Sequence, residues 1–179
     1  MGNEALTGCV AKPSQVKINS CLTQEQITLV QETWKLLRGD LSSCGVIVFT
    51  RFFQTNAEMK GLFPKIITIS EENRLEFVID EKMLQKHATT VMEGLGAAVE
   101  SLNNPYVLDN VLKAVGQTHA RRQVKPIMLK KLWPALDFGL SETLQDNYTK
   151  EAADAWRKVY EYICIRMKEG MKDTDDELS

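Results

Sequence analysis

The sequence lacks several features that would each indicate a class of protein. No apolar run has the length of a membrane-spanning helix, and no signal-peptide-like stretch stands near the start. The four cysteines include no CxxC pair, so neither a zinc site nor a dense disulfide framework is indicated. The 22 lysines and arginines are interspersed with 24 acidic residues, which argues against a nucleic-acid partner. We expect an intracellular, cytoplasmic and mostly reduced chain, and whether Cys44 and Cys164 pair stays open.

One block of helical periodicity lies between two polar ends. The 179 residues, of which 44% are hydrophobic, are enough for one well-buried core. Residues 1–21 are small and polar without a sustained period, and residues 172–179 are too acidic to pack. The sequence therefore predicts a flexible arm over 1–21, a single domain over 22–171 and a disordered tail over 172–179.

The periodic block reads as helices throughout. Three helices begin with a recognisable cap, and the cap residues are Thr23 (with Gln26 as its capping-box partner), Asn104 (followed by Pro105) and Thr149. The segment GVIVFTRFF contains β-branched residues but no strict alternation, so it too is predicted to be helical. We expect an all-α fold of seven or eight helices without a strand. Residues 66–80 are expected to be irregular, and a helix from Pro126 to about Leu144 is interrupted at Pro134.

The chain contains only two histidines, and both lie on apolar stripes. His87 shares its stripe with Leu84 and Val91, and His119 ends the stripe that begins at Leu108. A single histidine on such a stripe is usually a core residue whose nitrogens bond to backbone or water. Two imidazoles on successive helices can instead face each other across a slot, and neutral imidazole is a ligand of haem iron. No cysteine or carboxylate completes a four-ligand zinc site, which favours a metal held in a macrocycle.

Four features together resemble the globin family, over about residues 22–170. They are Trp34 in an early helix, the pair Phe63-Pro64, a distal histidine followed four residues later by a small apolar residue (His87 and Val91), and a proximal histidine that ends the next helix (His119). Within the family, the interval from 87 to 119 is similar to that of neuroglobin. The segment GVIVFTRFF, where Gly45 allows close helix approach, also resembles neuroglobin.

The resemblance implies a globin fold that encloses haem b (iron protoporphyrin IX). His119 would be the proximal and His87 the distal iron ligand, in a six-coordinate bis-histidine site. The second ring nitrogen of His119 is expected to donate a hydrogen bond to the carbonyl of Val115. Residues expected to line the haem or hold its propionates are Phe49, Phe63, Val91, Val115, Thr118, Arg122, Val124, Lys125 and Tyr160. Where neuroglobins commonly carry a lysine, three residues after the distal histidine, this chain has Thr90.

Three kinds of function remain open. The first is reversible binding of O2, NO or CO, or one-electron transfer and sensing with a redox partner. The second is an enzyme that reduces nitrite or oxidises nitric oxide with electrons from an external reductase. The third is a helical interaction module without haem, in which both histidines are ordinary core residues. No catalytic residue is assigned from the sequence.

The amino-terminal arm resembles that of globin X, a membrane-associated relative of neuroglobin. The resemblance rests on Met1-Gly2 and the nearby Cys9, and it implies acylation of Gly2 and Cys9 that holds the protein at a membrane surface. The acylation pattern requires Ser or Thr where this chain has Leu6, and Thr7 lies one position later.

Overall fold

The computed structural model describes residues 22–69 and 77–177, except for the side chains of Ile69 and residues 173–177. The arm over residues 1–21, with Gly2 and Cys9, lies outside the described residues, so its acylation stays a prediction. None of the described helices combines the length and the apolar composition that a membrane span requires.

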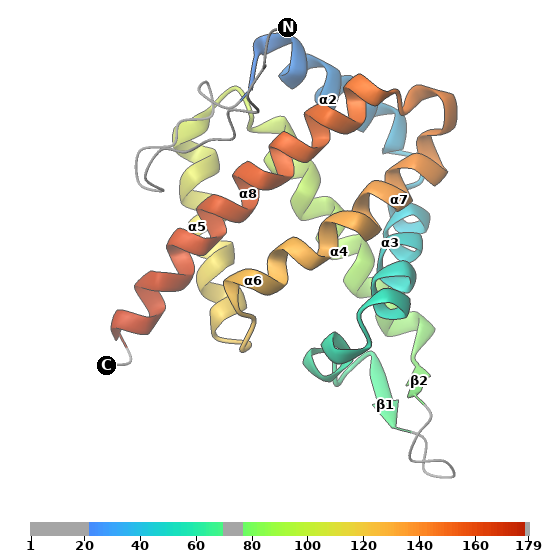
Figure 1. Ribbon diagram of the computed structural model, residues 1–179, viewed down its shortest axis with the longest axis vertical. Coiled ribbons are helices and arrows are strands. Elements are labelled where there is room, and N and C mark those ends of the chain that lie inside the picture. Colours follow the sequence, from blue (N-terminus) through green and yellow to red (C-terminus); the bar gives the residue numbers. More distant parts are fainter. Residues whose placement is uncertain (1–21, 70–76, 178–179) are drawn as a thin grey trace, which may run out of the picture.

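The described residues form seven α-helices, three 3₁₀ segments and one two-stranded sheet (Figure 1). In chain order they are α2 (Gln24–Leu37), α3 (Leu41–Thr55), η2 (Ala57–Leu62), β1 (Ile67–Ile69), β2 (Phe77–Ile79), α4 (Glu81–Glu100), α5 (Pro105–Ala120), α6 (Pro126–Leu129), η3 (Lys130–Leu132), α7 (Trp133–Leu144), η4 (Gln145–Asn147) and α8 (Lys150–Glu177). The predicted all-α class is confirmed. The predicted absence of strands is wrong.

The predicted helix caps are present. The Thr23 hydroxyl accepts from the Gln26 amide while the Gln26 side chain accepts from the Thr23 amide, which completes the capping box of α2. Asn104 accepts from the amide of Val107 at the start of α5, and the Thr149 hydroxyl accepts from the Ala152 amide at the start of α8. These contacts pair amides that the helix itself leaves without partners.

A short antiparallel hairpin replaces the irregular segment expected over 66–80. Ile67 pairs with Ile79 and Thr68 with Val78. The amide of Asp80 donates to the carbonyl of Ile66 at 2.8 Å, beside the pairing. The reason is the β-branched and aromatic residues on both sides of the acidic stretch, which favour extended backbone once a partner strand is available.

Two helix boundaries also differ from the sequence predictions. The helix expected from Pro126 to Leu144 is divided into α6, η3 and α7, and Pro134 lies in the first turn of α7, where its missing N–H breaks no helical bond. The tail predicted to be disordered is helical as far as Glu177. Met171 is buried near the end of α8, so the packed part of the helix can extend into the acidic residues.

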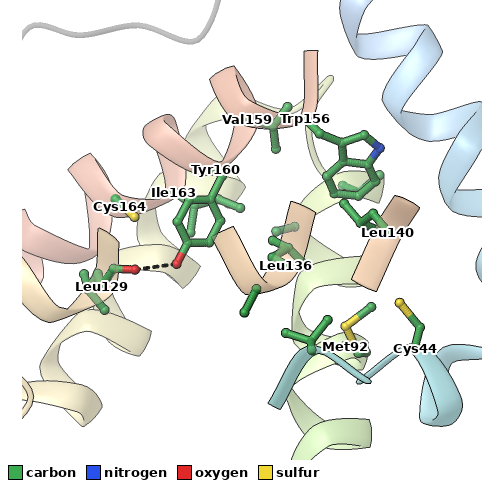
Figure 2. Packing of buried hydrophobic residues seen from close by; sticks show 14 of the residues in the cluster. Cys44, Met92, Leu129, Leu136, Leu140, Trp156, Val159, Tyr160, Ile163 and Cys164 are labelled. Atoms are coloured by element: carbon green, nitrogen blue, oxygen red, sulfur yellow. Dashed lines mark hydrogen bonds between the residues drawn. The ribbon is translucent and has the colours of Figure 1, made fainter. Parts of the chain in front are cut away.

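The helices that carry the two histidines are each held by a neighbour. The most extensive helix contacts join α5 to α8 and α3 to α4, and Figure 1 shows α8 running across the fold beside α5. In the core, Trp156 of α8 donates its indole N–H to the Thr33 hydroxyl at 2.9 Å, beside Leu136 and Leu140 of α7 (Figure 2). Two cysteines are also buried there, Cys44 and Cys164, and both are free thiols.

Gly45 brings α3 close to α4, as its place in the sequence predicts. A Cβ at this position would lie 2.9 Å from Cγ of Met92 and 3.0 Å from the carbonyl oxygen of Ala88. Ala88 follows His87 directly. The close approach therefore places the residues of α3, Phe49 among them, against the turn of α4 that carries His87.

Candidate functional site

The His119 ring is oriented by its own helix. It lies in the last turn of α5, half-buried, with Nδ1 at 2.8 Å from the carbonyl oxygen of Val115. A carbonyl can only accept, so Nδ1 donates. In the neutral ring Nε2 then carries the free lone pair. The predicted hydrogen bond to Val115 is confirmed, and it leaves the outer nitrogen of His119 available to a metal.

The chain leaves α5 by a tight turn around the His119 carbonyl. That carbonyl accepts from the amides of Arg122 at 3.0 Å and Val124 at 3.1 Å. Between them Gln123 has φ 64°, in the left-handed region that non-glycine residues seldom adopt. The turn leaves Arg122 exposed and brings Val124 back, half-buried, against the core.

His87 lies among aromatic rings. Its imidazole packs edge-on against Phe49 of α3, with ring centroids 4.8 Å apart, and against Phe63, which follows η2, at 5.5 Å. Within residues 22–69 and 77–172, neither ring nitrogen of His87 has a hydrogen-bond partner. A histidine with a purely structural role in a core is expected to use those nitrogens. The nitrogens of this half-buried ring are therefore open to water or to a bound group.

The electrostatic surroundings keep His87 neutral. Burial lowers the pKa of its imidazole, and the neighbouring Arg122 and His119 side chains lower the pKa further. A neutral imidazole has the lone pair that a metal needs.

An aromatic wall continues behind His87. Phe63 packs on Phe53 with centroids 5.0 Å apart and on Phe49 at 6.2 Å, and Phe52 completes the group at 6.3 Å from Phe63. Phe49, Phe52 and Phe53 are buried. Such a wall excludes water from one side of His87. Phe52 and Phe53 were not predicted as site residues, although the spacing of four residues from Phe49 to Phe53 indicates a shared helix face.

The other predicted residues lie in two places. Val91 is half-buried one turn after His87, and Val115 is 37% exposed one turn before His119. Thr118, Arg122 and Lys125 are exposed near the end of α5, and the Thr118 hydroxyl donates to the Ala114 carbonyl at 3.1 Å. An apolar side chain beside a metal-competent imidazole, with cations at the rim, is a surface that a flat apolar ligand with carboxylates would cover.

Tyr160 is buried on α8, and its hydroxyl already has a partner. It donates to the Leu129 carbonyl at 2.6 Å (Figure 2), and its ring lies 5.5 Å from that of Trp133. The hydroxyl therefore joins α8 to α6, and a role of the Tyr160 ring in lining the site stays a prediction.

The donor set fits haem better than a bare metal ion. Across residues 22–69 and 77–172 no group of three or more His, Cys, Asp and Glu side chains could hold a metal. The two imidazoles can each supply one nitrogen, which suits a group that carries its other metal ligands itself, as a porphyrin does.

The sequence and fold are similar to those of known haem proteins. Residues 46–167 match the family model described as Globin. Cytoglobin-1 of Oryzias latipes is 30% identical over 148 residues, which cover 82% of each chain, and neuroglobin of Tetraodon nigroviridis is 27% identical over 149 residues, 83% of this chain and 92% of that one. The fold is similar to the crystal structure of a hexacoordinated heme protein from an anhydrobiotic tardigrade. That likeness has a TM-score of 0.73 and 23% identity, and it covers 84% of this chain and 96% of the other.

Proposed function

The chain belongs to the globin family, and on that premise we propose that it binds haem b between His119 and His87 and uses it to bind diatomic gases or to transfer single electrons. Globins bind haem, and the absence of a CxxCH motif is consistent with the non-covalently held b type. One observation carries the proposal. His119 is near enough to His87 to lower the pKa of the His87 imidazole, and within the described residues each ring has a nitrogen without a protein partner.

Different residues act on the His119 side and on the His87 side of the site. The Val115 carbonyl holds the His119 ring in one orientation, with Nε2 free to bind a metal. Phe49 and Phe63 keep water from the His87 side. Haem, when bound, supplies an iron centre that takes a gas molecule or one electron. Arg122 and Lys125, both exposed near the end of α5, would supply the positive charges that pair with its carboxylates.

We propose that His87 would hold the iron of the resting protein together with His119, which corresponds to a six-coordinate bis-histidine site. A nitrogen of His87 would then gain a partner that the described residues do not supply. An external ligand would then compete with His87, and its apparent affinity would be lowered by the fraction of molecules in which His87 is displaced. The competing arrangement is an open site in which His87 only donates a hydrogen bond to bound oxygen.

Titration of the haem-free protein with ferric hemin tests haem binding itself. We expect a Soret band that saturates at one hemin per chain, with quenching of tryptophan fluorescence in step, since Trp133 lies beside Tyr160 at the start of α7. A hemin spectrum identical to that of free hemin at equal concentration would instead support the helical interaction module.

Nitrite reduction is a second candidate, because a Brassica napus relative named anaerobic nitrite reductase is 24% identical over 158 residues, 87% of this chain and 95% of that one. The same iron would need electrons from an external reductase. Steady nitrite consumption by the protein with a chemical reductant in excess separates catalysis from simple ligand binding, which stops at one ligand per haem.

We also propose that the arm anchors the protein to a membrane through acyl chains on Gly2 and Cys9. A single myristoyl chain binds membranes only marginally, with a constant of about 10⁴ M⁻¹, so the second chain is required for stable anchoring. Cys9→Ser is expected to move protein expressed in its native cell type into the soluble fraction while the acyl mass on Gly2 remains. Intact-mass analysis that finds Gly2 unmodified in the parent would overturn the proposal.

A further inference from the structure

Helices α5 and α8 touch backbone to backbone at two glycines. A Cβ on Gly116 of α5 would lie 2.7 Å from the carbonyl carbon of Met167 and 2.9 Å from its Cα. A Cβ on Gly170 of α8 would lie 2.7 Å from the carbonyl carbon of Lys113 and 2.8 Å from its Cα. Both obstacles are backbone atoms, which cannot turn aside as the end of a side chain can. The crossing therefore requires glycine on both helices.

An ion-pair network holds the same crossing. Arg166 of α8, with 5% of its side chain exposed, places Nε 3.2 Å from the carboxylate of Asp109 on α5 and Nη1 2.9 Å from Glu169. Tyr162 donates its hydroxyl to Asp109, and Lys113 of α5 lies 3.4 Å from Glu169. Buried charges tolerate little displacement, because a broken pair leaves an uncompensated charge. The glycines thus set how close the helices lie, and the ion pairs set how they are aligned along their axes.

One peptide group links this crossing to the proximal histidine. The carbonyl that accepts from His119 Nδ1 belongs to Val115, and its carbon is bonded to the nitrogen of Gly116. The Val115–Gly116 peptide is therefore both the orienting partner of the imidazole and a part of the contact with Met167. A displacement of α5 from α8 moves this peptide and the last turn of α5 together.

We propose that Gly116 is a positioning residue for His119, and that the α5–α8 crossing sets the geometry of the bond between His119 and the haem iron. The inference rests on the proposed function, because it requires His119 to be the proximal ligand. A purely structural crossing would affect the free energy of unfolding but not that bond. In the proposed role the crossing restrains the position of α5, because contacts between backbones deform less than contacts between side chains.

The test compares Gly116→Ala with Gly94→Ala, each in a His87→Leu background where His119 is the only protein ligand. A Cβ on Gly94, in the helix that carries His87, meets nothing within 4 Å, so this variant controls for the glycine-to-alanine change itself. Gly116→Ala is expected to shift the iron–histidine stretching band in the resonance Raman spectrum of the ferrous protein. It is also expected to speed haem loss by about 10-fold to 100-fold, as loss of an outer partner of a metal-bound histidine does. Gly94→Ala should leave both unchanged.

A second variant covers the case in which Gly116→Ala does not fold. Asp109→Asn inserts no atoms and can keep the hydrogen bond from Tyr162, but it removes the charge that pairs with Arg166. It is expected to shift the same band in the same direction by a smaller amount. The inference would be overturned if a folded Gly116→Ala protein had the same stretching frequency and haem-loss rate as the control. If Gly116→Ala does not fold, the same result for Asp109→Asn would overturn it. Absence of a Soret band in the Gly94→Ala control and the parent would overturn the proposed function instead.

Discussion

His119→Leu is expected to release the haem. The substitution removes the imidazole that Val115 holds in place, and the remaining His87 has no partner within the described residues to orient it. Loss of a ligand costs more than loss of its outer hydrogen-bond partner, which alone weakens metal binding by about 10-fold to 100-fold. We therefore expect the Soret band to disappear on gel filtration, whereas the parent keeps it.

The control for this prediction replaces the missing imidazole of His119 with free imidazole from solution. In His119→Gly, free imidazole can enter the space left by the side chain, and the Soret band is expected to return in its presence. Circular dichroism before hemin addition shows whether the variant has kept its helices. If His119→Leu retained haem and His87→Leu lost it, the assignment of the proximal and distal sides would be reversed.

His87→Leu is expected to convert a low-spin ferrous spectrum into a high-spin, five-coordinate one and to remove a limit on the rate of gas binding. In the parent, the observed rate of carbon monoxide binding should reach a plateau as the carbon monoxide concentration increases, because departure of His87 becomes rate-limiting. In the variant the rate should stay proportional to concentration, and the apparent affinity should rise by the inverse of the open fraction. Stopped-flow mixing over a range of carbon monoxide concentrations measures both.

The haem-free protein distinguishes a ligand histidine from a structural one. Because the ring nitrogens of His87 have no partner in the described part of the chain, and leucine is apolar, the His87→Leu change is expected to leave the melting temperature unchanged or higher. A structural histidine would instead lose hydrogen bonds and stability. A high-spin five-coordinate spectrum in the unsubstituted ferrous protein at neutral pH would return His87 to the hydrogen-bonding role.

Features that depend on residues one turn apart could be predicted from the sequence. The capping box of Thr23 and Gln26, the cap at Asn104 and the bond from His119 to Val115 all join residues within four positions of each other. Helical periodicity placed both histidines on faces that the structure leaves half-buried. These interactions form wherever the helix forms, so distant residues are not needed to specify them.

Features that depend on a distant partner were missed or left open. The hairpin of Ile67–Ile69 with Phe77–Ile79 requires two strands to meet, and neither strand is long enough to show a clear period. The helical extension of the tail depends on the buried part of α8. In both cases the local composition indicates one structure, and contacts formed elsewhere in the fold favour another.

The sequence by itself determined the helices, the pair of histidines and the internal partner of one of them, because those properties follow from local backbone geometry and residue type. Only the tertiary structure decided that Arg122 acts on His87, that the rings of Phe49 and Phe63 close on it, and that Gly116 and Gly170 meet between α5 and α8. Each of these brings together residues from different helices or turns. Their distances are set by close packing of whole helices, which no pattern within a single segment encodes.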